Sequence, residues 1–130
     1  MTSHNSGLTL NLALSYGSRS EIKNAITKII GDVQSGKLAV DQISESLISN
    51  YLQTAGLPDP DLIIRTSGEF RISNFMLWQI AYAEIYVTET FWPDFRTPDL
   101  YKALHNYLKR ERRFGMVTEQ LYANRSFQES

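Results

Sequence analysis

Strand-like runs alternate with helix-length amphipathic segments along this chain of 130 residues, and that alternation limits the possible folds. Leu8 to Tyr16 alternates apolar with small polar residues, and short apolar runs at Asp61–Arg65 and Ala83–Thr88 also read as strands. Segments with helical spacing lie between them. Strands separated by helices are typical of α/β domains, so we predict a mostly parallel sheet flanked by helices.

The helical segments have recognisable starts and stops. Ser18 and Glu21 form a Ser-x-x-Glu pattern that predicts a capping box at the start of the first helix. An apolar face on this helix, expected to lie on the sheet, comprises Ile22, Ile26, Ile29, Ile30 and Val33. The helices are predicted to run from Ser18 to Gly36, from about Asp41 to just before Gly56, over Ser73–Ala81, and onward from Thr97.

The amino-acid composition argues against several classes of protein. Basic and acidic residues number 13 and 14, and this near-neutral balance argues against a nucleic-acid partner. The absence of cysteine excludes disulfides and thiolate metal sites and suits a cytoplasmic protein. No run of 18 apolar residues is present, so no transmembrane segment is expected. We predict one domain over 1–130, with a polar N-terminal tail at 1–7 and a C-terminal tail at 116–130.

The stretch from Asp61 to Phe75 has the layout of an anion site. A buried strand places Arg65 at its carboxyl end, which is where open α/β sheets bind ligands. Gly68 allows the following loop to turn sharply, and Arg71 adds a guanidinium group whose geometry matches phosphate oxygens. On this pattern alone, Arg65 could equally form a structural ion pair with a carboxylate.

The loop leads into the third expected helix. Ser73 or Asn74 is predicted to cap that helix, whose free N–H groups and dipole would favour an anion. The pattern therefore predicts a diphosphate site in outline. Further along, the basic run from Lys109 to Arg113 invites a nucleic-acid or lipid interpretation, but cations in a last helical turn complement the helix dipole and favour a solvated helix end.

Several motifs in order carry a resemblance that covers nearly the whole chain. They are Leu10–Ile22, Pro58–Gln79, Ala81–Tyr86, Phe91–Phe95 and Arg112–Gly115. Together they resemble the cis-prenyltransferases, in particular the bacterial undecaprenyl diphosphate synthases (isoprenyl transferases). One departure is Phe70, where bacterial members commonly carry a histidine or another polar residue. Phenylalanine can neither donate a hydrogen bond nor transfer a proton, which puts a polar role at that position in doubt.

The resemblance assigns roles to individual residues. Positions matching Arg65, Arg71 and Ser73 hold the diphosphate of isopentenyl diphosphate, and Ile72 contributes its backbone. Glu84 matches the glutamate that helps to bind Mg²⁺, and one carboxylate is sufficient there when phosphate oxygens and water complete the octahedron. Possible supporting residues are Glu69, Asn74 and Arg19, each with a structural alternative. Glu69 could bond within the loop or be solvated, Asn74 could be a helix cap, and Arg19 could pair with Glu21 or another carboxylate.

The resemblance also shows what these residues lack. Family members carry an N-terminal loop with a His-Asp-Gly-Asn-Gly-Arg-like sequence, whose aspartate is the principal magnesium and catalytic residue. No Asp-Gly pair occurs in this chain, so no catalytic residue is expected in it. The chain resembles the C-terminal half of the cis-prenyltransferase fold, and we expect it to be inactive as a transferase on its own.

The implied reaction is the extension of an allylic diphosphate such as farnesyl diphosphate by isopentenyl diphosphate, giving cis-polyprenyl (undecaprenyl) diphosphate, a lipid carrier for cell-wall sugars. Mg²⁺ is the implied cofactor, a homodimer the implied assembly, and peripheral membrane contact would serve the lipid product. Two alternatives remain open: a non-catalytic subunit that lends its diphosphate site to a catalytic partner, and a phosphate-binding α/β module without a transferase role.

Overall fold

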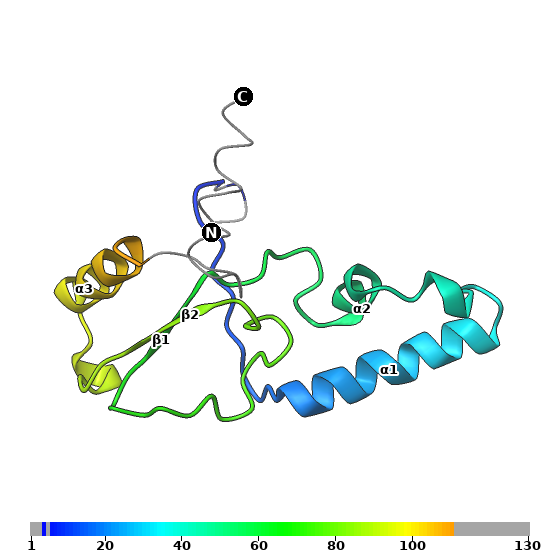
Figure 1. Cartoon of the computed structure of the whole chain (residues 1–130), viewed down its shortest axis with the longest axis horizontal. Helices are drawn as coiled ribbons and strands as arrows, with labels where there is room; N and C mark the ends of the chain where they lie inside the picture. Colours follow the sequence, from blue (N-terminus) through cyan, green and yellow to red (C-terminus); the bar gives the residue numbers. More distant parts are fainter. Residues whose placement is uncertain (1–3, 5, 111–130) are drawn as a thin grey trace, which may run out of the picture. The chain divides into compact units, whose positions relative to one another are not determined.

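A computed structural model describes residue 4 and residues 6–110, which fall into two units (Figure 1). The first unit lies within Met1–Leu57 and Ile72–Trp78, and the second within Pro58–Arg71 and Gln79–Ser130. The expected tail at 116–130 and the Arg112–Gly115 motif lie outside the described residues. In chain order the elements are α1 (Ser18–Gln34), η1 (Val40–Gln42), α2 (Glu45–Tyr51), β1 (Leu62–Arg65), β2 (Glu84–Val87), η2 (Trp92–Asp94) and α3 (Thr97–Leu108).

The second unit is built on a parallel pair of strands. β1 and β2 lie side by side, with Leu62 opposite Glu84 and Arg65 opposite Val87 (Figure 1). α3 packs against β2, and its Ala103 has no exposed surface. Pro98 occupies the first turn of α3, where its missing N–H removes no helical hydrogen bond. The predicted α/β class with a parallel sheet is confirmed in this unit.

In the first unit, α1 packs against α2, and its buried face matches the predicted one only in part, at Ile29. The buried residues of α1 recur about once per turn and are Ser18, Glu21, Ala25 and Ile29. Ile26 and Ile30, which we expected on the buried face, are each 51% exposed. Glu21 can be buried because the Tyr16 hydroxyl group and the Gln53 backbone N–H donate hydrogen bonds to its carboxylate, which offset the cost of burying a charge.

The predicted capping box at the start of α1 is wrong. Gly17 is the N-cap residue, and it has no side chain that could accept a hydrogen bond from the helix. Ser18 is already helical, and its hydroxyl oxygen instead accepts a hydrogen bond from the Leu77 N–H at 2.9 Å. The second helix also starts later than expected: Ser44 caps α2 by accepting a hydrogen bond from the Leu47 N–H, after a separate 3-10 turn.

The expected strand over Leu8–Tyr16 does not form. This segment has no regular secondary structure, and its alternating leucines Leu8, Leu10, Leu12 and Leu14 are 71–86% exposed. A strand needs a neighbouring strand to receive its backbone hydrogen bonds. Among the described residues, only β1 and β2 pair as strands, so the alternating pattern has no ladder to join.

The helix expected over Ser73–Ala81 is also absent, and turns occupy the segment. Ser73, Asn74 and Met76 have φ angles of 54°, 61° and 48°, in the left-handed region that a right-handed helix excludes. No helix begins at Ser73, so no helix dipole favours an anion there, and that prediction is wrong.

Candidate functional site

The residues suggested as a site divide between the two units. Arg65, Glu69, Arg71 and Glu84 belong to the second unit, whereas Ile72, Ser73, Asn74 and Arg19 belong to the first. The boundary between the units falls between Arg71 and Ile72, so the sequence motif joins them covalently.

Arg65 is the last residue of β1. The loop after it is hydrogen-bonded to the segment that follows β2. The Ser67 and Gly68 N–H groups donate to the carbonyl oxygens of Thr90 and Thr88, at 3.0 and 2.9 Å. Gly68 has φ +64°, and a Cβ atom built there would lie 2.6 Å from the Glu89 carboxylate. The positive φ angle favours glycine at this position, in keeping with the sharp turn predicted from sequence, whereas the Glu89 carboxylate is the end of a flexible side chain that can move.

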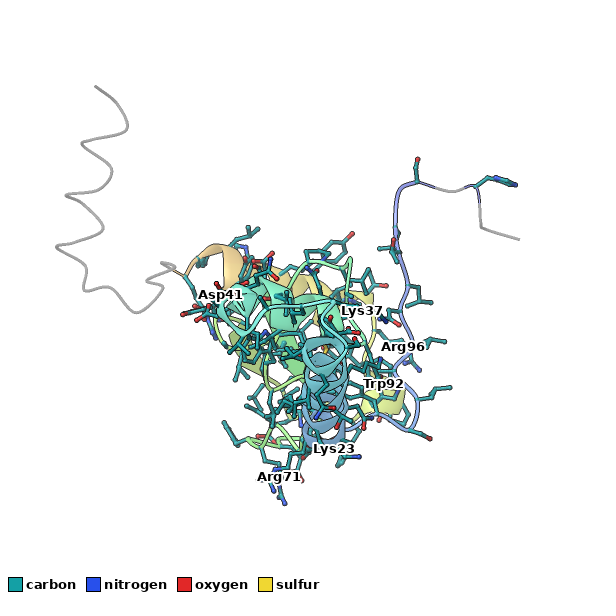
Figure 2. All side chains as sticks on the ribbon, turned by 90° about the vertical axis from the view of Figure 1, so that its right-hand side faces the viewer. Lys23, Lys37, Asp41, Arg71, Trp92 and Arg96 are labelled. Carbon is teal, nitrogen blue, oxygen red and sulfur yellow. The ribbon has the colours of Figure 1, made fainter. Side chains whose placement is uncertain are left out.

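Arg71 pairs with a carboxylate from its own loop. Its Nε atom lies 2.5 Å from Glu69 Oε2, and 74% of the Arg71 side chain is exposed. Figure 2 shows this side chain projecting away from the ribbon. A planar guanidinium group can bind a carboxylate on one edge and offer its other N–H groups to phosphate oxygens. Glu69, left open between loop bonding and solvation, bonds within the loop.

Glu84 begins β2, so it lies at the opposite end of the two-stranded sheet from Arg65. Glu84 is opposite Leu62, which lies three residues before Arg65 on β1, a separation of about 10 Å at the usual rise per residue. Glu84 Oε2 accepts a hydrogen bond from Arg110 Nη1 at 2.8 Å, and the same nitrogen donates to the Ile85 carbonyl oxygen at 3.0 Å. Arg110, which we expected at a solvated helix end, therefore links the chain just after α3 to the start of β2.

The donor chemistry at Glu84 suits magnesium as a single ligand. A carboxylate oxygen is a ligand that Mg²⁺ prefers. Residues 4 and 6–110 contain no group of three His, Cys, Asp or Glu side chains placed to hold a metal ion. Phosphate oxygens and water would therefore have to supply the remaining ligands, and the Glu84 pair with Arg110 would have to open or share its oxygen.

In the first unit, Asn74 holds the start of α1. Its side-chain Oδ1 accepts from the Arg19 N–H and its carbonyl oxygen accepts from the Ser18 N–H, both at 2.9 Å. The rings of Tyr16 and Phe75 add an edge-to-face contact with centroids 5.6 Å apart. Helical spacing gave no signal for this arrangement. The Ser-Asn pair could have provided one, since asparagine tolerates left-handed backbone and serine favours turns.

Two nearby side chains behave as structural residues. Burial, and then the hydrogen bond that the Tyr16 hydroxyl donates to Glu21, raise the pKa of Tyr16 above its ordinary value of 10.0. Trp78 is half-buried and donates from Nε1 to the Ser49 hydroxyl at 3.0 Å. Of the helices in the described ranges, none has the length and apolar character needed to cross a bilayer.

Comparisons with known proteins point to one family. The family model for undecaprenyl diphosphate synthase, a prenyltransferase family, matches residues 1–115. Isoprenyl transferases from Geobacter sulfurreducens and Geobacillus kaustophilus are 55% and 56% identical to the chain over 120 and 117 residues, which is 92% and 90% of its length. These matches cover 49% and 46% of the two relatives, so the chain spans about half the length of the curated relatives it matches.

Solved structures agree. A lavandulyl diphosphate synthase from Lavandula x intermedia, in complex with dimethylallyl diphosphate, matches with a TM-score of 0.76 and 43% identity, covering 78% of this chain and 44% of that one. A probable undecaprenyl diphosphate synthase from Campylobacter jejuni matches with a TM-score of 0.71 and 37% identity, covering 88% of this chain and 50% of that one. The fold and the sequence therefore lead to the same group of proteins.

Proposed function

The chain belongs to the undecaprenyl diphosphate synthase family of prenyltransferases, and we propose that it supplies the isopentenyl diphosphate site of a cis-polyprenyl diphosphate synthase. The observation that carries this proposal is Arg65 at the carboxyl end of a parallel strand, followed by the exposed guanidinium group of Arg71. Both lie inside the family match. Parallel strands present ligand-binding residues at this end, and two guanidinium groups suit a polyanion.

Each residue would contribute one kind of contact. Arg65 and Arg71 would neutralise the diphosphate charge, the Ser73 hydroxyl would donate a hydrogen bond, and Ile72 would offer its backbone N–H. Glu84 would be the protein ligand of Mg²⁺. Because Glu84 lies at the opposite end of the two-stranded sheet from Arg65, the ion would contact the diphosphate on the side away from Arg65 or through water. Glu69 would pair with Arg71 within the loop, and Arg19 would add a further cation close to the turn at Asn74.

In the proposed reaction, an allylic diphosphate such as farnesyl diphosphate loses its diphosphate group. A bond forms between its allylic carbon and the terminal alkene carbon of isopentenyl diphosphate. Loss of a proton from the isopentenyl unit then leaves a cis double bond, and repeated additions yield undecaprenyl diphosphate. Charge developing on the departing diphosphate is what preorganised cations stabilise best. The dimeric assembly, the cytoplasmic location and a peripheral contact with a membrane complete the proposal.

The chain contains no Asp-Gly pair, so the aspartate loop implied for the allylic site is not among its 130 residues. We expect the purified chain alone to form no cis-polyprenyl diphosphate. Since the chain matches about half of its relatives, a second candidate is a non-catalytic subunit that lends its site to a chain carrying that loop. Co-purification with such a chain would favour the subunit; polyprenyl product from the chain alone would overturn the expected inactivity.

Calorimetric titration of isopentenyl diphosphate with Mg²⁺ into the folded chain tests the proposal. We expect saturable binding that Arg71→Ala weakens about tenfold to a hundredfold, as for the loss of charged hydrogen bonds. Arg96→Ala removes another exposed arginine of the same unit and should leave binding unchanged (Figure 2). Inorganic pyrophosphate serves as the competing ligand: equal affinity would favour a phosphate-binding module, and absence of binding by the folded chain would overturn the proposed site.

A further inference from the structure

The turn that carries Ser73 has a costly backbone conformation. Ser73, Asn74 and Met76 all have positive φ angles between 48° and 61°. Residues other than glycine reach this region only at a cost in free energy, and such conformations persist where surrounding contacts hold them. The Ile72–Trp78 segment therefore needs an external support, and the contacts within the first unit identify it.

That support is the first turn of α1. Three hydrogen bonds of 2.9 Å join the two segments: Ser18 N–H to the Asn74 carbonyl oxygen, Arg19 N–H to Asn74 Oδ1, and Leu77 N–H to the Ser18 hydroxyl oxygen. Ser18 is fully buried, so its hydroxyl group bonds in a site shielded from water. The bonds are made by Asn74 and Leu77, so Met76 lies between them and Ser73 directly precedes Asn74. All three left-handed residues are therefore at or next to these hydrogen bonds.

The contact with the turn also provides hydrogen-bond acceptors for the N–H groups at the start of α1. The first N–H groups of a helix have no partners inside the helix, and they are usually met by a side chain at the N-cap. Gly17 holds that position and has no side chain to offer. The Asn74 side chain takes this role from 55 residues away. A Cβ atom at Gly17 would lie 3.0 Å from Asn74 Nδ2, so glycine leaves the space that the asparagine needs.

We propose that Asn74 is a positioning residue for diphosphate binding: by capping α1 it holds the turn in which Ser73 presents its hydroxyl group and Ile72 its backbone. This inference rests on the proposed function. Asn74 acts through the two residues before it, Ile72 and Ser73, because its own side-chain oxygen accepts a hydrogen bond from the Arg19 N–H. A small rotation about the backbone at Ser73 would redirect the hydroxyl group, so the clamp at α1 sets the direction of that donor.

The test is a set of calorimetric titrations of the chain with isopentenyl diphosphate and Mg²⁺. Asn74→Ala removes the cap and keeps an unfavourable φ angle, and we expect it to weaken binding about tenfold, the usual effect of losing one such bond. Asn74→Gly removes the cap but relieves the φ strain, so it should fold readily and lose less affinity. Asn24→Ala, an exposed asparagine on α1 away from the turn, is the matched control and should bind as the unaltered chain does.

A double-mutant cycle with Ser73→Ala separates positioning from simple stabilisation. If Asn74 acts through Ser73, the double variant Asn74→Ala, Ser73→Ala should bind about as weakly as Ser73→Ala alone. Amide hydrogen exchange should meanwhile show faster exchange at Arg19 in both Asn74 variants. Unchanged affinity in the two Asn74 variants, or losses that simply add, would overturn the positioning role while leaving the proposed function intact. No binding by the unaltered folded chain would overturn the proposed function and the positioning role together.

Discussion

Arg110 Nη1 lies 2.8 Å from Glu84 Oε2, so the carboxylate proposed as a magnesium ligand is already paired with a cation. The two residues are 26 positions apart, and Arg110 also bonds to the Asn106 side chain through its Nε atom. The pair is partly exposed, with 36% of the Arg110 side chain and 28% of the Glu84 side chain accessible. A partly solvated pair of this kind is weak enough to exchange with a metal ion.

Removing Arg110 should make Glu84 a better metal ligand. In Arg110→Ala, the Glu84 carboxylate loses the cation that competes with the metal ion. Binding of isopentenyl diphosphate should then need a magnesium concentration lower by up to about fivefold. This factor corresponds to ~1 kcal/mol, the usual size for a partly exposed ion pair. Titrations at a series of magnesium concentrations measure this. Glu84→Gln is the control that should lose the magnesium dependence. An unchanged dependence in Arg110→Ala would mean that the pair does not compete with the metal ion.

Neutralising Glu69 should strengthen diphosphate binding. Glu69→Gln removes the carboxylate that holds the Arg71 Nε atom and that repels an approaching anion. We expect isopentenyl diphosphate to bind up to about fivefold more tightly at low salt, with a smaller gain at physiological salt, because screening weakens exposed charges. Calorimetry at both salt concentrations provides the measurement. Weaker binding would instead show that Glu69 mainly orients the Arg71 guanidinium group.

A side chain at Gly68 should destabilise the loop after β1. Gly68→Ala puts a Cβ atom on a residue with left-handed backbone and displaces the flexible Glu89 side chain, and should lower the free energy of unfolding by about 1–3 kcal/mol. Gly31→Ala is the matched control, since a Cβ atom at Gly31 within α1 meets nothing within 4 Å. That control should raise the free energy of unfolding by about 0.5–1 kcal/mol. Urea unfolding of both variants tests the contrast, and equal effects would contradict it.

Stability at alkaline pH should depend on Tyr16. Burial and the bond to Glu21 raise the pKa of Tyr16, so the folded chain holds this proton more tightly than the unfolded chain does. The resulting contribution to the free energy of unfolding is fully present below the ordinary pKa of 10.0 and is lost as the pH rises through the raised pKa.

Tyr16→Phe should therefore flatten the decline in stability above pH 10.0, while lowering stability by about 1 kcal/mol at neutral pH through the lost hydrogen bond. Unfolding midpoints measured across this pH range are the readout. Tyr101→Phe, at a residue that is 67% exposed, should keep the alkaline decline of the unaltered chain. A profile for Tyr16→Phe parallel to that of the unaltered chain would rule out this contribution.

The local sequence pattern correctly predicted β1 and the start of α3, because both depend on residues that are close in sequence. β1 lies within its predicted bounds because a short apolar run is preceded by prolines and followed by Gly68. α3 starts at Thr97, as the Thr-Pro pair predicts. Leu8–Tyr16 forms no strand, since no partner strand lies among the described residues, and Ser73–Ala81 forms no helix, since long-range contacts override its helical spacing.

The sequence by itself determined the family, the α/β class, and the order in which Arg65, Gly68 and Arg71 follow the strand. Tertiary structure alone decided which residues distant in sequence form hydrogen bonds with one another. Asn74 meets the start of α1 across 55 positions, and Arg110 meets Glu84 across 26. Periodicity and capping rules act over about one or two helical turns. Hydrogen bonds between distant segments depend on where the folded chain brings their donors and acceptors together, and no local pattern contains that information.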